Sequence, residues 1–284
     1  MEIAKTVSEL RSFLAKGTRK NYSIGFVPTM GALHEGHLSL VRASKAKCDE
    51  TIVSIFVNPT QFAQTEGLEK YPRTLDKDIA LLQKEDVGIL FIPSKEEIYP
   101  SGAATFVTVE KITESFEGAI RPTHFRGVAT VVTSLFTIVR PEVAFFGQKD
   151  LQQTAVIKRM VRDLHFPLKI EVCETMREPD GLAMSSRNQF LSAEEREESL
   201  ILSKTIFYVR DVMLEGMPFS VARLRGVNLF NSLKKRAVLE YLDIINPETF
   251  QLAESFKVNE EAAVIIAARI GETRLIDNVI IAAK

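Results

Sequence analysis

The chain has 284 residues, of which 45% are hydrophobic, and its 36 Lys and Arg residues nearly balance its 37 Asp and Glu residues, giving a formal net charge of −1. Because single hydrophobic cores seldom grow beyond about 250 residues, this length favours two domains. The near-zero charge excludes the broad basic surface that binding to nucleic acid or to anionic membranes needs, so any phosphate site must be local.

The cysteines and the apolar runs argue against a secreted or membrane-spanning protein. Cys48 and Cys173 lie far apart and neither belongs to a C-x-x-C pair, so neither a disulfide framework nor a zinc knuckle is indicated. Residues 1–10 carry acids and lack the apolar core of a signal peptide. The longest apolar run, residues 128–139, includes three threonines and is shorter than the roughly 20 residues of a membrane span. We therefore expect a soluble, cytoplasmic protein.

Short β-branched or aromatic runs alternate with helical patterns over the first 175 residues. The runs predict strands at residues 23–27, 51–57, 88–92, 143–146 and 168–174, and a further strand at 106–110 outside this alternation. Between them, apolar residues recur at helical spacing at Leu75, Ile79 and Leu82 and at Val156, Met160 and Leu164. Apolar strands separated by helices predict a parallel sheet that is covered on both faces and binds ligands beyond the carboxyl ends of its strands.

The pattern changes after residue 175. A loop with Pro179, Asp180 and Gly181 leads to a charged helix from about residue 193 and to another from about residue 221. Strands follow at residues 238–245, 262–270 and 274–281, and Gly271 marks a tight turn between the last two. We therefore divide the chain into two domains, residues 1–175 and residues 176–284, of which the second is a smaller α+β domain.

The most informative motif is G-F-V-P-T-M-G-A-L-H-E-G-H at residues 25–37, where a short strand and a Gly/Pro turn lead into a helix. His34 and His37 share one side of the first helical turn, and Gly31 and Gly36 let the backbone come close to a ligand. Unpaired backbone N–H groups at a helix start suit a phosphate. The sequence therefore predicts a phosphate site here.

Two other interpretations of the histidine pair are open, since such a pair also binds metals or caps a helix. For zinc, only His124 and His165 remain as further histidine ligands, and the H-E-x-x-H spacing is absent. His165, which precedes Phe166 and Pro167, is interpreted as structural.

A second motif, F-F-G-Q-K-D at residues 145–150, also follows a predicted strand and opens a helix. This position lets Lys149 project its ammonium group over the same crevice. Asp150 is either the N-cap of the helix or a ligand. Gln152 and Gln153 follow one turn into the helix.

A third motif, D-G-L-A-M-S-S-R-N at residues 180–188, lies where the two predicted domains join. Ser185, Ser186 and Arg187 offer hydrogen-bond donors and a fixed charge for a triphosphate. A loop at a domain junction can close and exclude water, so we expect a movable clamp there.

Two further segments carry polar side chains. Asn58 and Gln61 follow the second predicted strand and suit a small polar acid. Residues 121–126 place two arginines and His124 in one loop, which is either part of the site or packing.

Together these motifs resemble one known family nearly from end to end. The chain resembles the pantoate–β-alanine ligases of the H-x-G-H nucleotidyltransferase superfamily, in the family's order and spacing. The resemblance is carried by P-T-M-G-A-L-H-E-G-H, F-V-N-P-T-Q-F, Y-P-R-T, R-P-T-H-F-R-G-V, F-F-G-Q-K-D-x-Q-Q and D-G-L-A-M-S-S-R-N, and in the second domain by Y-L-D and T-R-L-I-D-N.

The resemblance implies a Rossmann-like, doubly wound domain for ATP and pantoate, a C-terminal lid domain, a homodimer, and Mg²⁺ with ATP as co-substrate. It implies condensation of pantoate with β-alanine to pantothenate, a coenzyme A precursor, through pantoyl adenylate, with release of AMP and pyrophosphate. The implied catalytic residues are His34, His37, Lys149 and Arg187. The implied ATP site comprises Met30, Gly31, Ala32, Leu33, His34, Glu35, Gly36, His37, Gly147, Gln148, Lys149, Asp150, Met176, Met184, Ser185, Ser186 and Arg187. The implied substrate contacts are Gln61, Gln153, Pro28, Thr29 and Asn58.

Two positions depart from the family pattern. Met176, which the resemblance places against adenine, stands where valine is commoner. Lys77 stands where some relatives have an acid beside Asp78, the residue to which a magnesium role would fall.

Elementary chemistry accounts for the implied reaction. Pantoate is ionised at pH 7, so it can attack the α-phosphate of ATP without a protein nucleophile or general base. Negative charge then grows on the α-phosphate and the departing pyrophosphate, where imidazole and cationic side chains stabilise it together with magnesium. The resulting mixed anhydride needs a closed site that keeps water out.

Two alternatives use the same features. One is another adenylyltransferase on this scaffold, which releases pyrophosphate without forming an amide. The other is a catalytically silent nucleotide-binding or RNA-interacting module, against which the intact histidine pair, Lys149 and the near-neutral charge argue.

Overall fold

The computed structural model describes residues 1–17, 22–62, 68–256 and 260–282, and the chain forms two compact units. The first unit contains residues 1–147 and 156–174, and the second contains residues 148–155 and the chain from residue 175 onward. The passage from Glu174 to Thr175 lies next to the predicted domain boundary. Residues 148–155, expected in the first domain, group with the second unit.

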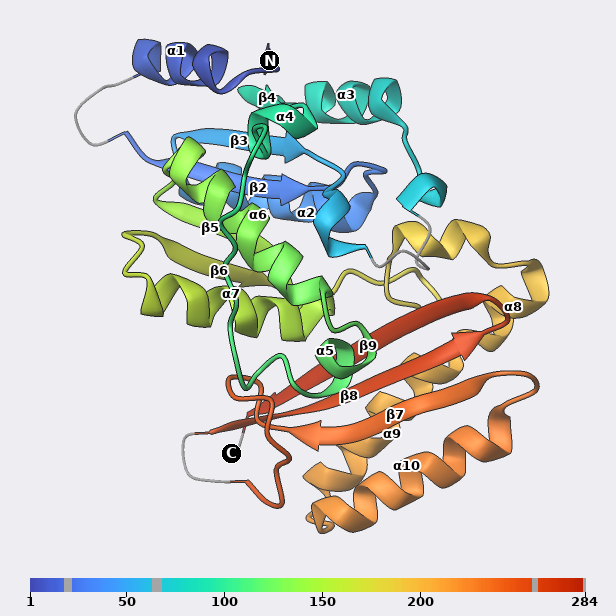
Figure 1. The fold of residues 1–284 in the computed structure, drawn as a ribbon. Coiled ribbons are helices and arrows are strands. Elements are labelled where there is room, and N and C mark those ends of the chain that lie inside the picture. Colours follow the sequence, from blue (N-terminus) through green and yellow to red (C-terminus); the bar gives the residue numbers. More distant parts are fainter. Residues whose placement is uncertain (18–21, 63–67, 257–259, 283–284) are drawn as a thin grey trace. The chain divides into compact units, whose positions relative to one another are not determined.

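The first unit is built on a six-stranded sheet in the order β1-β4-β3-β2-β5-β6, with all strands parallel (Figure 1). Its strands are β1 (Glu2–Ala4), β2 (Ile24–Thr29), β3 (Glu50–Ile55), β4 (Ile89–Phe91), β5 (Val143–Gly147) and β6 (Lys169–Cys173). The last five confirm the predicted alternation and the α/β fold class. Strand β1 was not predicted, because a strand of three residues is too short to show a periodic pattern.

The strand predicted at residues 106–110 is wrong, since this segment belongs to none of the strands in the described part of the chain. The backbone N–H of Val107 donates to the hydroxyl of Thr130 at 3.0 Å. Val107 and Val109 pack against the first hydrophobic core. Packing of alternate side chains against a helix, and not pairing with a strand, therefore explains the β-branched pattern here.

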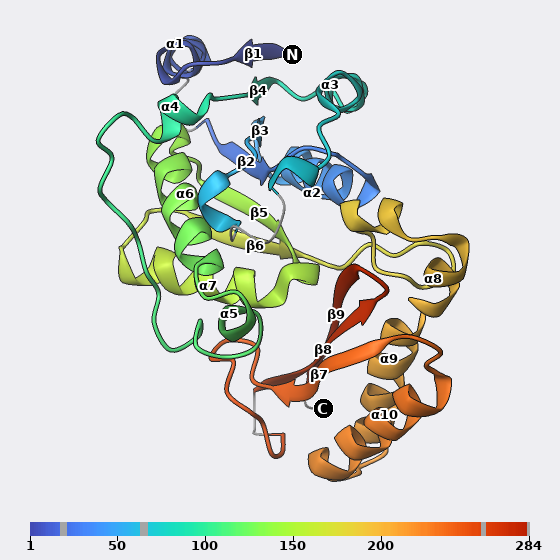
Figure 2. The same ribbon diagram turned by 45° about the vertical axis from the view of Figure 1, so that its right-hand side comes forward.

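Helices cover both faces of this sheet (Figure 2). Phe26 of β2 packs with α1, α4, α6 and the part of α7 that begins at Val156, whereas its neighbour Val27 packs with α2 and α3. Successive residues of a strand point to opposite faces of the sheet. The packing of Phe26 and Val27 against different helices therefore shows that both faces of the sheet are buried. The helices are α1 (Val7–Gly17), α2 (Glu35–Lys47), α3 (Leu75–Lys84), α4 (Lys95–Ile98), α5 (Phe116–Ile120), α6 (His124–Val139) and α7 (Leu151–Asp163), with short 3₁₀ turns at η1 (Pro59–Gln61) and η2 (Leu68–Lys70).

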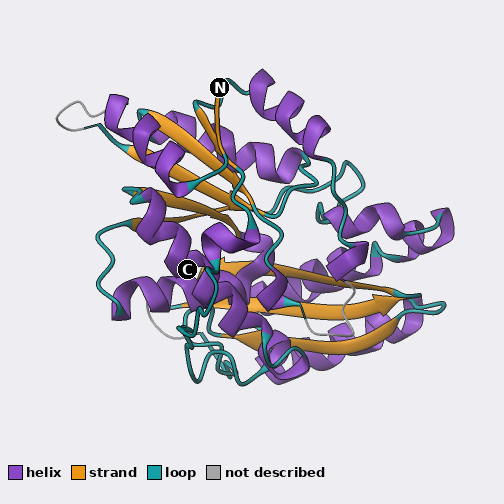
Figure 3. Ribbon diagram, turned by 45° about the horizontal axis from the view of Figure 1, so that its top comes forward, coloured by secondary structure: helices purple, strands orange, loops and turns teal. Residues whose placement is uncertain are grey.

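The second unit has an antiparallel sheet in the order β7-β8-β9 (Figure 3). Its strands lie where the sequence predicted them, and Gly271, at φ 55°, makes the turn between the last two. Helices α9 and α10 cover one face through Ile206 and Phe230. The elements are η3 (Gln148–Asp150), η4 (Ser186–Phe190), α8 (Ala193–Glu198), α9 (Ile201–Leu214), α10 (Phe219–Leu233), β7 (Val238–Ile245), β8 (Glu261–Ile270) and β9 (Thr273–Ala282).

None of the helices within the described ranges is both long and apolar enough to cross a membrane.

The strand order of the first unit sets β2 and β5 side by side at a reversal of winding direction. From β2 the chain proceeds to β3 and β4 on one side, whereas β5 and β6 lie on the other. Open parallel sheets bind ligands in the crevice at such a reversal, beyond the carboxyl ends of the strands. The first predicted motif begins in β2 and the second begins in β5, and both continue beyond the carboxyl ends of these strands.

Helix α6 approaches the turn η1 very closely at Gly127. A Cβ atom at this position would lie 2.4 Å from the carbonyl oxygen of Thr60 and 2.6 Å from the nitrogen of Gln61. Both atoms belong to the backbone, so the neighbour cannot move aside without moving the turn. The absence of a side chain at Gly127 therefore sets the position of Gln61.

We expect Gly127→Ala to destabilise the protein by about 1–3 kcal/mol, the usual cost of overpacking. Urea unfolding measures this loss. The matched control is Gly147→Ala, where a Cβ would meet nothing within 4 Å and where we expect a change of about 0.5 kcal/mol or less. Equal stabilities of the two variants would contradict the close approach.

One carboxylate joins α8 to the residues before β7. Oε1 of Glu198 accepts the backbone N–H groups of Lys235, Arg236 and Ala237 at 2.7, 2.6 and 2.8 Å. Burial acts to raise the pKa of Glu198, but these hydrogen bonds together outweigh burial and lower it.

Because this pKa is lower in the folded than in the unfolded chain, Glu198 stabilises the fold above its ordinary pKa of 4.5, and the contribution is lost as the pH falls through the folded pKa. We expect Glu198→Gln to lower the melting temperature near neutral pH and to have little effect in strong acid. Calorimetry from neutral pH to strong acid measures these melting temperatures. The control is Glu197→Gln, since that carboxylate is 75% exposed. A difference from wild type that does not change with pH would refute the assignment.

Candidate active site

A buried carboxylate holds the turn between β2 and α2. Gly31 and Ala32 have φ of 80° and 51°, in the left-handed region that L residues rarely adopt. Asp78 of α3, only 1% exposed, accepts the N–H of Ala32 at 3.0 Å, the N–H of Leu33 at 2.9 Å and the hydroxyl of Thr74 at 3.1 Å. The first two of these hydrogen bonds satisfy backbone N–H groups that lie between the end of β2 and the start of α2.

Asp78 therefore stabilises the turn before α2, a structural role that the sequence did not indicate. Both of its carboxylate oxygens accept hydrogen bonds within the protein. Across the described ranges, no group of three or more His, Cys, Asp or Glu side chains could hold a metal ion. The magnesium role of Asp78 stays a prediction.

His34 and His37 cap the N-terminus of α2 reciprocally. Nδ1 of His34 accepts the N–H of Gly36 at 3.2 Å, and Nδ1 of His37 accepts the N–H of His34 at 3.3 Å. The ring centroids are 4.1 Å apart. A neutral imidazole that accepts at Nδ1 carries its hydrogen on Nε2. The pair therefore caps the helix, and each imidazole carries its N–H donor on Nε2 at a helix N-terminus, where negative charge is favoured.

The residues around the pair are fixed locally. The hydroxyl of Thr29, at the end of β2, donates to the carbonyl of Ser54 at 2.8 Å and accepts the N–H of Gly31 at 3.2 Å. Glu35 forms an ion pair with Arg42 along α2. Glu35 therefore contributes its backbone to the turn, while its carboxylate is engaged elsewhere.

A closed amide network follows β3. Nδ2 of Asn58 donates to Oε1 of Gln61 and to the carbonyl of Gly127, both at 3.1 Å, and its Oδ1 accepts the hydroxyl of Tyr99 at 2.8 Å. The hydroxyl of Tyr99 is the donor in this bond, and burial raises its pKa. Nε2 of Gln61 lies 3.0 Å from Sδ of Met30. The structure thus brings Gln61 and Asn58 together with Met30, from two motifs that are far apart in the sequence.

Residues 121–126 were expected in one loop, but the structure places residues 124–126 in the first turn of α6, and their side chains divide between the two interpretations left open by the sequence. Nδ1 of His124 lies 3.0 Å from the carbonyl oxygen of Gln61, so His124 belongs to the surroundings of the amide network. The guanidinium of Arg126 lies 3.9 Å from the ring centre of Phe106 and serves packing.

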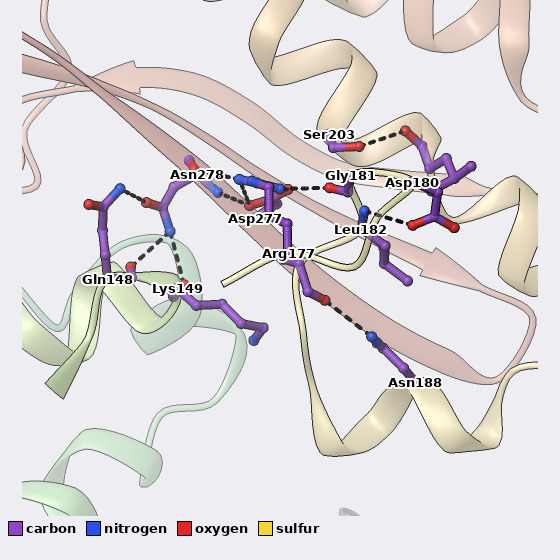
Figure 4. A network of polar contacts seen from close by, with 12 residues as sticks. Gln148, Lys149, Arg177, Asp180, Gly181, Leu182, Asn188, Ser203, Asp277 and Asn278 are labelled. Carbon is purple, nitrogen blue, oxygen red and sulfur yellow. Dashed lines mark hydrogen bonds and ion pairs between the residues drawn. The ribbon is translucent and has the colours of Figure 1, made fainter. Parts of the chain in front are cut away.

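In the second unit, Asn278 of β9 holds the segment that contains Lys149 (Figure 4). Nδ2 of Asn278 donates to the carbonyls of Gln148 and Lys149 at 3.0 and 2.9 Å, and Oδ1 accepts from Nε2 of Gln148 at 3.2 Å. Nζ of Lys149 lies 3.5 Å from Oδ1 of Asp150, and the Lys149 side chain is 17% exposed. Gln153 is half-buried in α7.

Asp277, the neighbour of Asn278, holds the predicted clamp loop. The guanidinium of Arg177 donates to both carboxylate oxygens of Asp277, at 2.7 and 2.9 Å, and to the carbonyl of Gly181 at 3.0 Å. It also lies 4.7 Å from the ring centre of Phe207. Burial raises the pKa of Asp277, and the bonds from Arg177 act in the opposite direction. The pair fixes the turn that precedes Met184.

The rest of the clamp loop is ordered by short-range hydrogen bonds. The N–H of Met184 donates to the carbonyl of Met176 at 2.9 Å, and Oγ of Ser185 accepts the N–H of Arg187 at 3.3 Å to cap η4. Arg187 is exposed, and its guanidinium forms no hydrogen bond or ion pair with a residue in the described part of the chain.

Sequence reasoning missed Arg177, Asp277, Asn278 and Tyr99, which hold predicted site residues in place without belonging to the predicted site. The available signal was the adjacent acid and amide of T-R-L-I-D-N in an otherwise apolar strand. Buried polar groups of this kind are hydrogen-bonded, so they point to a partner.

Comparison with known proteins identifies the family of the chain. Residues 2–280 match the model of the family described as Pantoate-beta-alanine ligase. Pantothenate synthetase from Acidobacterium capsulatum is 49% identical over 296 residues, covering 99% of this chain and 97% of that protein. Pantothenate synthetase from Pseudothermotoga lettingae is 46% identical over 281 residues, covering 99% of each.

Solved structures give the same result. The crystal structure of pantothenate synthetase from Thermus thermophilus has a TM-score of 0.92 and 43% identity, covering 98% of this chain and 99% of that chain. The pantoate-beta-alanine ligase from Francisella tularensis, solved with beta-gamma ATP and beta-alanine, has a TM-score of 0.80 and 38% identity, covering 98% of this chain and 97% of that chain. Full-length similarity at this level shows that the protein is an enzyme and belongs to the pantoate–β-alanine ligase family.

Proposed function

We propose that this enzyme joins pantoate to β-alanine at the expense of ATP, through pantoyl adenylate, with release of pyrophosphate and AMP. Support comes from the family and from the relative solved with beta-gamma ATP and beta-alanine. The observation that carries the site assignment is the histidine pair, because His34 and His37 place two Nε2–H donors at a helix N-terminus directly after β2.

In the first step, the ionised carboxylate of pantoate attacks the α-phosphate, the bond to the leaving pyrophosphate breaks, and no protein base is needed. The work left to the protein is to stabilise growing negative charge with donors already in position. We assign this work to His34 and His37 in the first unit and to Lys149 and Arg187 in the second. The second unit would act as the lid that keeps water from the adenylate.

We assign pantoate to Gln61, with Pro28, Thr29, Asn58 and Gln153 as further contacts. Asn58 also accepts and donates hydrogen bonds within the protein, through which it orients the Gln61 amide. The carboxylate of β-alanine would later contact the same amide while its amine attacks the acyl carbon and displaces AMP.

The ATP contacts fall on three short segments. Because the carbonyl of Met176 already accepts the N–H of Met184, adenine would meet the N–H or the side chain of Met176. The segments are Met30 to His37, Gly147 to Asp150, and Met184 to Arg187 together with Met176.

Magnesium would enter bound to ATP as part of the substrate. Mg²⁺ is often held by phosphate oxygens, water and one or two carboxylates, without a dedicated protein cage. The donor set fits this case, since Asp78 is engaged in the turn and the described residues contain no cluster of metal ligands. A homodimer and a cytoplasmic location are further proposals that rest on the family resemblance.

Replacing His37 tests the phosphate assignment. His37→Ala removes both the cap and the imidazole, whereas His37→Gln leaves an acceptor that suits a capping box at this position. We expect both variants to release pyrophosphate from ATP and pantoate about a hundredfold more slowly, the usual cost of losing one such donor. The control His165→Asn, at a left-handed backbone position with φ 54°, should keep the wild-type rate. Release of pyrophosphate at the wild-type rate in both His37 variants would exclude this role.

Replacing Gln61 tests the pantoate assignment. Loss of a hydrogen bond to a charged group costs about 1.5–3 kcal/mol, so Gln61→Ala should raise the KM for pantoate by roughly 10- to 100-fold. The KM for ATP should stay roughly unchanged. Steady-state kinetics with each substrate varied separately give both values, and Gln251→Ala at an exposed position is the control. Equal losses for pantoate and ATP would instead show a misfolded site.

A further inference from the structure

Strand β9 carries two adjacent polar residues in a buried environment. Asp277 and Asn278 are each 3% exposed, and their neighbours along the strand include Leu275, Ile276 and Val279. Successive residues of a strand point to opposite faces. Accordingly, Asp277 holds Arg177 while Asn278 holds Gln148 and Lys149, as Figure 4 shows.

The hydrogen bonds of Asn278 concentrate on a single short segment. Its Nδ2 donates hydrogen bonds to the consecutive carbonyls of Gln148 and Lys149, and its Oδ1 accepts one from the Gln148 side chain. Because a buried amide without partners is costly, these contacts fix the backbone of this segment relative to β9. The direction in which the Lys149 side chain leaves the backbone is fixed with it.

We propose that Asn278 is a positioning residue for adenylate formation, acting through Lys149. This inference rests on the proposed function, in which the ammonium of Lys149 stabilises charge on the phosphates. Asn278 itself bonds to protein groups and needs no contact with substrate. Its effect would be to hold the ammonium where the charge develops.

The expected loss of rate in the Asn278 variants follows from how closely a catalytic group must be placed to the reacting atoms. A displacement of about 1 Å at a catalytic group can cost roughly a hundredfold in rate. Asn278→Ala removes all the side-chain hydrogen bonds without adding charge. Asn278→Leu keeps the branching at Cγ, removes the amide donor and acceptor and adds no buried charge, so it is the second variant if the cavity left by alanine prevents folding.

The test is a double-mutant cycle on pyrophosphate release from ATP and pantoate. We expect each Asn278 variant to slow this step roughly 10- to 100-fold in the wild-type background. In the Lys149→Ala background, the same substitution should slow it by less than about threefold, because the group through which Asn278 acts is gone. Conversion of supplied pantoyl adenylate and β-alanine to pantothenate should keep close to the wild-type rate in the Asn278 variants.

Asn246→Ala is the matched control, since this amide lies in the same unit and bonds to Glu260 and to the backbone of Glu248 and Thr249, away from the Lys149 segment. It should leave both half-reactions unchanged.

The outcomes separate this inference from the proposed function. If Lys149→Ala alone leaves adenylate formation unchanged, the proposed role of Lys149 is wrong and the positioning role falls with it. If Lys149→Ala slows the step but the Asn278 variants keep wild-type rates, only the positioning role is overturned. If the Asn278 variants slow both half-reactions equally, the role of Asn278 is merely structural. The same conclusion follows if the rate losses caused by the Asn278 and Lys149 substitutions multiply independently in the cycle.

Discussion

A buried carboxylate that holds a left-handed turn is the interaction on which the candidate site depends. Asp78 accepts the N–H groups of Ala32 and Leu33, which otherwise would lie in the turn after β2 without partners. Leaving such groups unsatisfied costs about 1–3 kcal/mol each. The turn determines where α2 begins, and the start of α2 determines where the two imidazoles lie. A helix further along the chain therefore sets the position of the histidines to which we assign phosphate binding.

The same arrangement recurs at the other segments to which we assign a role, each of which is fixed by a buried polar residue within its own unit. Asn58 orients Gln61, Asp277 holds Arg177, and Asn278 holds the backbone of Lys149. This suits a reaction whose substrates bring their own nucleophiles. Where the protein forms no covalent bond, its contribution comes from placing donors and charges before the reaction begins.

The sequence predicted those parts of the fold and site that leave a local pattern. Strands buried on both faces read as apolar runs, and Gly/Pro turns mark where the polar segments begin, so the parallel sheet and the histidine motif could be predicted. Strand β1 is too short for such a pattern, and residues 106–110 carry a strand-like pattern because Val107 and Val109 pack into the core. The task of Asp78, the meeting of Met30 with Gln61 and the partners of Asn278 depend on tertiary contacts between distant segments, which local spacing does not encode.

We propose that fixed donors and charges drive attack of a carboxylate on ATP before any amine takes part. Mass spectrometry of the enzyme mixed with ATP and pantoate, with β-alanine left out, tests this most directly. We expect pyrophosphate to be released and an acyl adenylate to stay bound to the enzyme, to be converted to pantothenate and AMP when β-alanine is added. Release of pyrophosphate only after β-alanine is added, with no adenylate at any earlier time, would contradict it.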